Sequence, residues 1–177
     1  MSDGDSTRER SAKAAALRLL ARRPLSLAEV HARLERQGYG PDEIEEACGR
    51  LGELGYLDDA RLALDFIVTR AARLSHGPEK LVEALCRRGV ERTVAHAALD
   101  RARAEGELDD LDLLRRRLRR HLRDPHGPLD RRDYARVYNA LRRAGFDPEA
   151  IRRELDSYRE PASHDQPTTD ETTDDFA

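Results

Sequence analysis

The amino-acid sequence predicts an all-α protein of three tandem three-helix repeats in an elongated, curved array, followed by a disordered acidic C-terminal tail. Shifting the chain by 51 residues, and then by a further 56, superimposes three sets of positions: Leu34, Leu85 and Leu141; Gly38, Gly89 and Gly145; Cys48, Leu99 and Leu155. Hydrophobic and charged residues each make up 38% of the chain, which suits narrow apolar stripes better than a thick core. Units repeated at such spacings stack, because each is too small to bury its apolar face alone.

The repeat register divides the chain into five parts. We expect a flexible N-terminus at residues 1–7, helical repeats at 8–56, 57–106 and 107–159, and a disordered acidic tail at 160–177. The third repeat carries a five-residue insertion near residues 124–130. The tail holds six acidic residues and no Lys or Arg, and its Pro, Thr and Ser content buries too little surface to offset chain entropy.

The first two helices of repeat 1 have clear boundaries. The first should end before Pro24, since the residue preceding a proline disfavours helical geometry. Ser26 and Glu29 form a capping box, and Gly38 supplies the left-handed stop of the second helix. The apolar stripes are Ala12, Ala16 and Leu20, then Leu27, Val30 and Leu34.

The third helix of repeat 1 runs from Pro41, a first-turn proline, to Gly55. Asp42 and Glu43 complement the helix dipole at its start. Its predicted stripe is Ile44, Cys48, Leu51 and Leu54.

Repeats 2 and 3 follow the same plan. The first helix of repeat 2 has the stripe Ala60, Ala63, Ile67 and Ala71, and a shift of 51 gives Leu111, Leu114, Leu118 and Leu122 in repeat 3. The middle helices start at Gly77-Pro78 and before Tyr134, and they end at Gly89 and Gly145. The last helices carry Val94, Ala98 and Ala102 in repeat 2, and Ile151 and Leu155 after Asp147-Pro148 in repeat 3.

Basic charge is concentrated at one end of the helical body. Residues 115–159 hold 14 Arg, no Lys and seven acids, a net charge of +7 in a chain whose net charge is −3. Guanidinium groups suit phosphate because they donate two parallel hydrogen bonds and keep their charge. We therefore expect contacts with nucleic-acid phosphates or with an acidic partner surface to come from Arg115, Arg116, Arg119, Arg120, Arg131, Arg132 and Arg136. The alternative is a solvated helix face in an arginine-biased chain.

The sequence favours a binding protein over an enzyme. Asp58, Asp59, Asp109 and Asp110 begin helices after glycine-containing turns, so helix capping explains them better than catalysis or metal binding, with a partner contact as the alternative. The six histidines lack the spacing of a metal site, and the sequence has no phosphate loop or nucleophile elbow. We expect no cofactor and no metal, and two free, largely buried thiols at Cys48 and Cys86.

Five motifs together resemble the RecX family of bacterial regulatory proteins, which act on the RecA recombinase. They are Leu34-x-x-x-Gly38-Tyr39, the run Leu54 to Arg61, His76-Gly77-Pro78, Leu85 to Val90, and Ala144-Gly145-Phe146-Asp147. The resemblance covers about residues 12–158. The acidic tail and the insertion near residues 124–130 depart from the plain family pattern, but neither touches the apolar stripes.

The resemblance implies a negative modulator of RecA. Such a protein lies along the groove of the RecA filament on single-stranded DNA, bridges neighbouring subunits, and represses ATP hydrolysis, strand exchange and co-protease activity. Two alternatives stay open, a helical repeat protein that binds DNA directly and a helical adaptor for another protein. The sequence lacks a signal peptide and an apolar run long enough to span a membrane, so we expect a cytoplasmic monomer without membrane contacts. The tail acids are expected to compete with DNA for the basic repeat.

Overall fold

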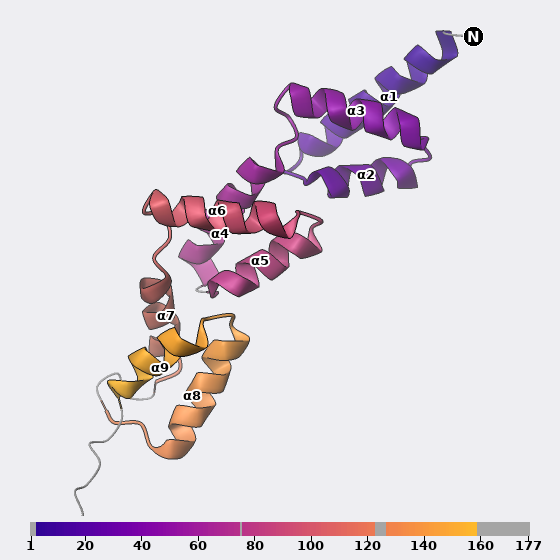
Figure 1. The fold of residues 1–177 in the computed structure, drawn as a ribbon. Coiled ribbons are helices and arrows are strands. Elements are labelled where there is room, and N and C mark those ends of the chain that lie inside the picture. The colour runs from indigo at the N-terminus through magenta and orange to yellow at the C-terminus, as the bar shows by residue number, and fades with distance from the viewer. Residues whose placement is uncertain (1–2, 75, 123–126, 159–177) are drawn as a thin grey trace, which may run out of the picture.

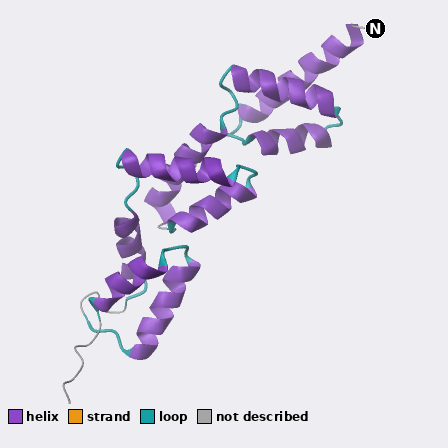
Figure 2. Ribbon diagram, viewed as in Figure 1, coloured by secondary structure: helices purple, strands orange, loops and turns teal. Residues whose placement is uncertain are grey.

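The computed structural model describes residues 3–74, 76–122 and 127–158, and their regular secondary structure is helical (Figures 1 and 2). The helices are α1 (Asp3–Leu20), α2 (Leu27–Arg36), α3 (Pro41–Glu53), α4 (Asp59–Leu74), α5 (Pro78–Arg87), α6 (Arg92–Ala104), α7 (Asp110–Arg119), α8 (Arg131–Arg143) and α9 (Pro148–Asp156). The predicted all-α class is confirmed. The acidic tail at 160–177 lies outside the described residues.

The helices pack in consecutive triplets. Helices α1, α2 and α3 contact one another, as do α4, α5 and α6, and then α7, α8 and α9. The three triplets follow one another in an elongated, gently curved row, with α1 at one end and α9 near the other (Figure 1). The array predicted from the repeats is therefore the observed architecture.

The helix boundaries follow from local chemistry. The Ser26 hydroxyl accepts a hydrogen bond from the Glu29 amide, and the Glu29 carboxylate accepts one from the Ser26 amide, which confirms the predicted capping box. The middle helices end at glycines with left-handed backbone, at φ +86° for Gly38, +81° for Gly89 and +86° for Gly145. Glycine is the residue that adopts this conformation without a Cβ penalty.

Helix α1 starts earlier than the repeat register indicates. It begins at Asp3, inside the segment 1–7 for which the sequence predicts flexibility. No proline interrupts residues 3–20, so helical hydrogen bonding continues back to the start of the described chain.

The apolar core is divided unevenly among the triplets. The first triplet has its own cluster, which includes Val30, Leu34, Ile44 and Leu51. The second and third triplets share one continuous cluster that runs from Leu62 to Leu155. Apolar packing therefore joins the last two triplets directly.

The prediction of burial is wrong for four stripe residues. Leu27 is 48% exposed, Leu54 is 50% exposed and Leu111 is 42% exposed, and Ala60 at the start of α4 is exposed as well, although each continues an apolar helical spacing. Each lies within one residue of the end of its helix, where the chain turns away from the packed face. In α7 the buried positions are Leu113, Leu114 and Leu118 instead.

Consecutive triplets meet through equivalent contacts, in which the glycine end of one middle helix packs on the start of the preceding middle helix. Between the first and second triplets, the Ser26 hydroxyl donates to the Arg88 carbonyl, and Gly89 lies against Ala28 with no room for a Cβ. Between the second and third, the Gly77 amide donates to the Ala144 carbonyl at 2.9 Å. The repeat register extends to the junctions, since Ser26 corresponds to Gly77 by the shift of 51 and Gly89 to Gly145 by the shift of 56.

An ion pair also joins the first two triplets. The Arg88 guanidinium lies 2.8 Å from a Glu29 carboxylate oxygen, and Arg23 lies 3.0 Å from the other. Burial raises the pKa of the Glu29 carboxyl, but hydrogen bonds from Arg88, Arg23 and the Ser26 amide outweigh that effect and hold the pKa at about 2. The Glu29 carboxylate is therefore ionised at neutral pH and fixed to the second triplet.

Candidate nucleic-acid interface

The seven arginines predicted to bind nucleic acid all lie in the third triplet. Arg115, Arg116 and Arg119 lie on α7, Arg120 caps its C-terminus, and the other three lie on α8. Three of the seven are engaged in ion pairs within the chain: Arg115 with Glu154 at 2.9 Å, Arg116 with Asp112 at 2.9 Å, and Arg136 with Asp133 at 3.0 Å. The hydrogen bond to Glu154 raises the pKa of Arg115. These pairs reduce the charge available to a ligand.

The other four arginines are not engaged in this way. Arg119, Arg120, Arg131 and Arg132 are exposed, and none of them forms an ion pair within the described part of the chain. Exposed guanidinium groups of this kind provide sequence-independent, salt-sensitive affinity for a phosphate backbone.

The four predicted aspartates stabilise the start of helices or connect them. The Asp58 carboxylate accepts from the Arg61 amide at 2.9 Å, and the Asp109 carboxylate accepts from the amides of residues 111 and 112. Asp59 accepts from the Leu27 amide at 2.9 Å, which ties the start of α4 to the start of α2. Asp110 pairs with Arg103 at 2.9 Å. The structure thus places all four at helix starts, separated into two pairs.

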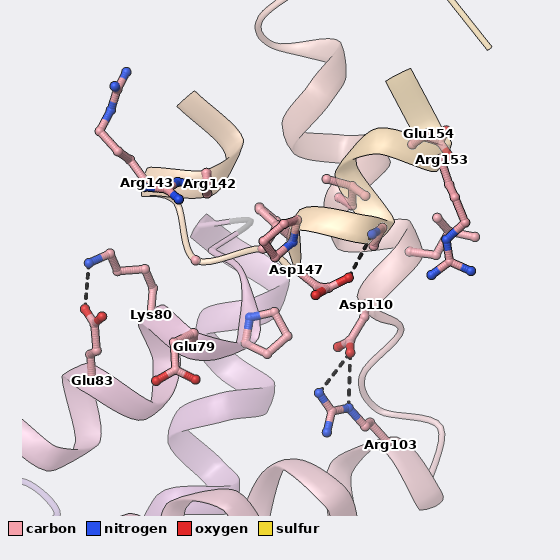
Figure 3. A pocket seen from close by; sticks show the side chains of 17 residues that line it. Glu79, Lys80, Glu83, Arg103, Asp110, Arg142, Arg143, Asp147, Arg153 and Glu154 are labelled. Carbon is pink, nitrogen blue, oxygen red and sulfur yellow. Dashed lines mark hydrogen bonds and ion pairs between the residues drawn. The ribbon is translucent and has the colours of Figure 1, made fainter. Parts of the chain in front are cut away.

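A wide groove, with a volume of about 1160 Å³, lies between the second and third triplets (Figure 3). Its apolar lining includes Leu111, Leu114 and Phe146. Its charged lining contains both signs, from Glu79, Lys80, Glu83, Arg103, Asp110, Arg142, Arg143, Asp147, Arg153 and Glu154. Ion pairs join Lys80 to Glu83 and Arg103 to Asp110 within it. A surface with mixed charge and an apolar floor suits a protein partner better than a uniformly anionic polymer.

Sequence reasoning missed this groove because its residues come from α5, α6, α7, α8 and α9, which are far apart along the chain. The signal available was the repeat register, which places the start of α5 against Gly145 in the same way as α2 against Gly89. That register predicts where two triplets meet, but the charges that line the meeting point differ from one repeat to the next.

The described residues contain neither a metal-binding cluster nor a membrane-spanning helix. No three His, Cys, Asp or Glu side chains there are grouped so as to hold a metal ion. None of the helices described is both long enough and apolar enough to cross a bilayer.

Comparison with known proteins decides the family. A profile for the first three-helix domain of RecX matches residues 12–51. A regulatory protein RecX from Thermus thermophilus is 42% identical over 135 residues, which is 76% of this chain and 83% of the relative. Another from Mycobacterium avium is 33% identical over 165 residues, or 90% of this chain and 93% of the relative. The chain belongs to the RecX family of regulatory proteins.

Solved RecX structures have the same fold. The crystal structure of RecX from Lactobacillus salivarius matches with a TM-score of 0.70 and 21% identity, covering 85% of this chain and 98% of that one. A second RecX crystal structure matches with a TM-score of 0.73 and 16% identity, covering 86% of this chain and 73% of that one. Membership of this family implies regulation of the RecA recombinase, and the relatives' names describe regulatory proteins.

Proposed function

We propose that this RecX-family protein is a negative modulator of RecA that binds the RecA filament on single-stranded DNA and represses its ATPase, strand-exchange and co-protease activities. The observation that carries the proposal is the extended row of three triplets, which offers a long open surface to a polymeric partner (Figure 1). A compact globule of the same length would offer one patch. A row can contact successive subunits of a filament at once, and linked contacts raise the overall affinity.

In this proposal two surfaces of the protein bind the filament. The groove between the second and third triplets provides protein contacts, since its ten charged residues, five acidic and five basic, accompany apolar side chains. The exposed arginines Arg119, Arg120, Arg131 and Arg132 provide phosphate contacts, with Arg115, Arg116 and Arg136 beside them. Protein contacts then determine which filament is bound, and the arginines add affinity that falls as salt rises.

The three repeats act as separate binding units within the row. We assign them to residues 8–56, 57–106 and 107–159. The packing of helices within each triplet supports this division. Bridging of neighbouring RecA subunits by adjacent repeats would restrict the relative movement that ATP turnover and strand exchange require.

The proposal is tested by titrating the protein into an ATPase assay of RecA from the same organism on single-stranded DNA. The DNA-dependent rate should fall at or below stoichiometric amounts of the protein. An unchanged rate across the titration would remove the proposed activity.

A second candidate function is direct binding of DNA, which is favoured by the four exposed arginines that form no ion pair with any described residue. Equal affinity for naked single-stranded DNA and for the RecA filament would support it. The adaptor hypothesis is separated from both by reversing Arg115, Arg116, Arg119 and Arg120 to Glu. Unchanged DNA and filament binding with an intact fold would favour the adaptor.

A further inference from the structure

A second, smaller hollow lies at the same junction as the groove and has a different chemistry. Its volume is about 310 Å³, and its lining consists of His76, Lys80, Arg117, His121, Arg143 and the small residues Ala140 and Ala144. Every titratable side chain in this lining is basic. We call it the junction pocket. Four separate parts of the chain meet there: the segment before α5, α5 itself, the C-terminal part of α7, and the end of α8.

The backbone around the junction pocket is fixed by the contact between triplets. The Gly77 amide donates to the Ala144 carbonyl at 2.9 Å, and the Glu79 amide donates to the Gly145 carbonyl at 3.3 Å. A Cβ at Gly77 would lie 2.3 Å from the Gly145 carbonyl group, so the two backbone segments are in direct contact. The basic side chains therefore converge from elements that are held rigidly in relation to one another.

Unsatisfied polar atoms belong to two of the residues that line the junction pocket. Within the described part of the chain, the buried Nε of Arg117 and the buried Nε2 of His121 have no hydrogen-bond partner. Buried polar atoms are normally hydrogen-bonded, and an orphaned donor is often explained by a missing ion or ligand. A guanidinium nitrogen in a basic hollow requires an anionic partner.

The positive charge is only partly neutralised by neighbouring groups. Lys80 pairs with Glu83 at 2.6 Å. Arg136 on α8, whose charge lowers the pKa of His121, pairs with Asp133 at 3.0 Å. The charge of Arg70 on α4 likewise lowers the pKa of His76. Arg117 and Arg143 form no ion pair within the described residues. The pocket thus keeps an excess of positive charge close to unpaired donors.

We propose that the junction pocket binds a phosphate group, and that in the proposed function this group is a phosphodiester of the single-stranded DNA. The source of the phosphate rests on the proposed function, but the chemistry of the site does not. Arg117 and Arg143 pair with the phosphate oxygens, His121 donates through Nε2 when protonated, and the small side chains of Ala140 and Ala144 leave space for the anion. This adds to the exposed arginines a pocket that orients the strand at the meeting point of two repeats.

The histidines give the site a pH dependence with a defined sign. Burial first, and then Arg117, Arg70 and Lys80, lower the pKa of His76. Burial, Arg117 and Arg136 lower the pKa of His121. Both rings therefore carry little charge at neutral pH, and they gain it as the pH falls through their lowered pKa values. A bound phosphate favours the charged rings, so by linkage it must raise both pKa values.

The first experiment follows the histidine rings of the full chain by NMR, with His76 and His121 assigned from His76→Gln and His121→Gln. Addition of pyrophosphate, and separately of a short oligothymidylate, should shift both rings and raise both pKa values, while His31 and His96 stay unchanged. Unmoved His76 and His121 rings would overturn the proposal. Movement with pyrophosphate but not with the oligonucleotide would support the phosphate site and exclude DNA as its source.

The second experiment compares Arg117→Gln/Arg143→Gln with the matched control Arg36→Gln/Arg87→Gln, which removes the same charge from exposed positions in the first two triplets. Anisotropy with the labelled oligonucleotide should show a loss of on the order of tenfold for the pocket variant and less than about twofold for the control. Equal losses would contradict a specific pocket. Because Arg117 is partly buried, Arg143→Gln alone provides a variant at an exposed position, and it should lose affinity in the same direction. These assays need no RecA, so their failure would leave the ATPase test of the proposed function unaffected.

Discussion

Substitution of Gly145 tests the contact between the second and third triplets, and Gly38 offers a matched control. Both glycines have φ of +86°, and both end a middle helix at equivalent repeat positions. A Cβ at Gly145 would lie 2.6 Å from the Lys80 backbone nitrogen, whereas a Cβ at Gly38 would have nothing within 4 Å. Gly38→Ala therefore imposes only the backbone strain, and Gly145→Ala imposes the same strain together with a clash against backbone.

The expected magnitudes follow from these contacts. Alanine in the left-handed region costs about 1–2 kcal/mol at either position. At Gly145 the clash adds about 1–3 kcal/mol. Separation of the two backbone segments also weakens the Gly77–Ala144 and Glu79–Gly145 hydrogen bonds, at about 0.5–1.5 kcal/mol each. Gly145→Ala should thus lower the free energy of unfolding by about 2–6 kcal/mol more than Gly38→Ala does.

Urea unfolding followed by circular dichroism measures this difference, and small-angle X-ray scattering reports whether the row becomes more extended or flexible. We expect a larger radius of gyration for Gly145→Ala in native buffer and an unchanged value for Gly38→Ala. Equal losses of stability in the two variants would refute the argument that the triplets are held together at this glycine.

Three further outcomes are expected. Glu29 has a folded-state pKa of about 2, below its ordinary value of 4.5, so its contribution to folding stability is present above about pH 5 and is lost as the pH falls toward 2. In urea unfolding, Glu29→Gln should lower the free energy of unfolding by about 1–2 kcal/mol at pH 7 and by progressively less in acid. A difference that does not change with pH would count against the ion pair with Arg88. Arg119→Gln/Arg120→Gln should reduce the salt dependence of single-stranded DNA binding by about 1.4 in log–log slope, at about 0.7 per phosphate contact, and a slope equal to that of wild type would show that these arginines touch no phosphate. Truncation after Arg159 removes six acidic residues and should raise DNA affinity, whereas equal affinity would reject competition by the tail.

The sequence predicts the helices well because their boundaries depend on local chemistry. The capping box at Ser26, the proline start at Pro41 and the glycine stops at Gly38, Gly89 and Gly145 each act within a few residues of themselves. The repeat spacing adds the stacking of triplets, since similar units bury similar faces.

The candidate sites were less predictable because they depend on how distant segments meet. Arg115, Arg116 and Arg136 form part of a basic run in the sequence, but the fold supplies each with an acidic partner. Arg117 belongs to the same run, yet it lies beside His76 and Arg143, which no spacing along the chain brings together. Leu27, Leu54 and Leu111 fit apolar helical spacing but lie at helix ends, where periodicity does not determine burial.

Co-sedimentation with RecA filaments tests the central claim most directly, because it measures association with the proposed partner itself. Filaments formed on single-stranded DNA with a non-hydrolysable nucleotide should carry the protein into the pellet in a saturable manner, in larger amount than DNA without RecA does. A protein that stays in the supernatant at every filament concentration would contradict the claim.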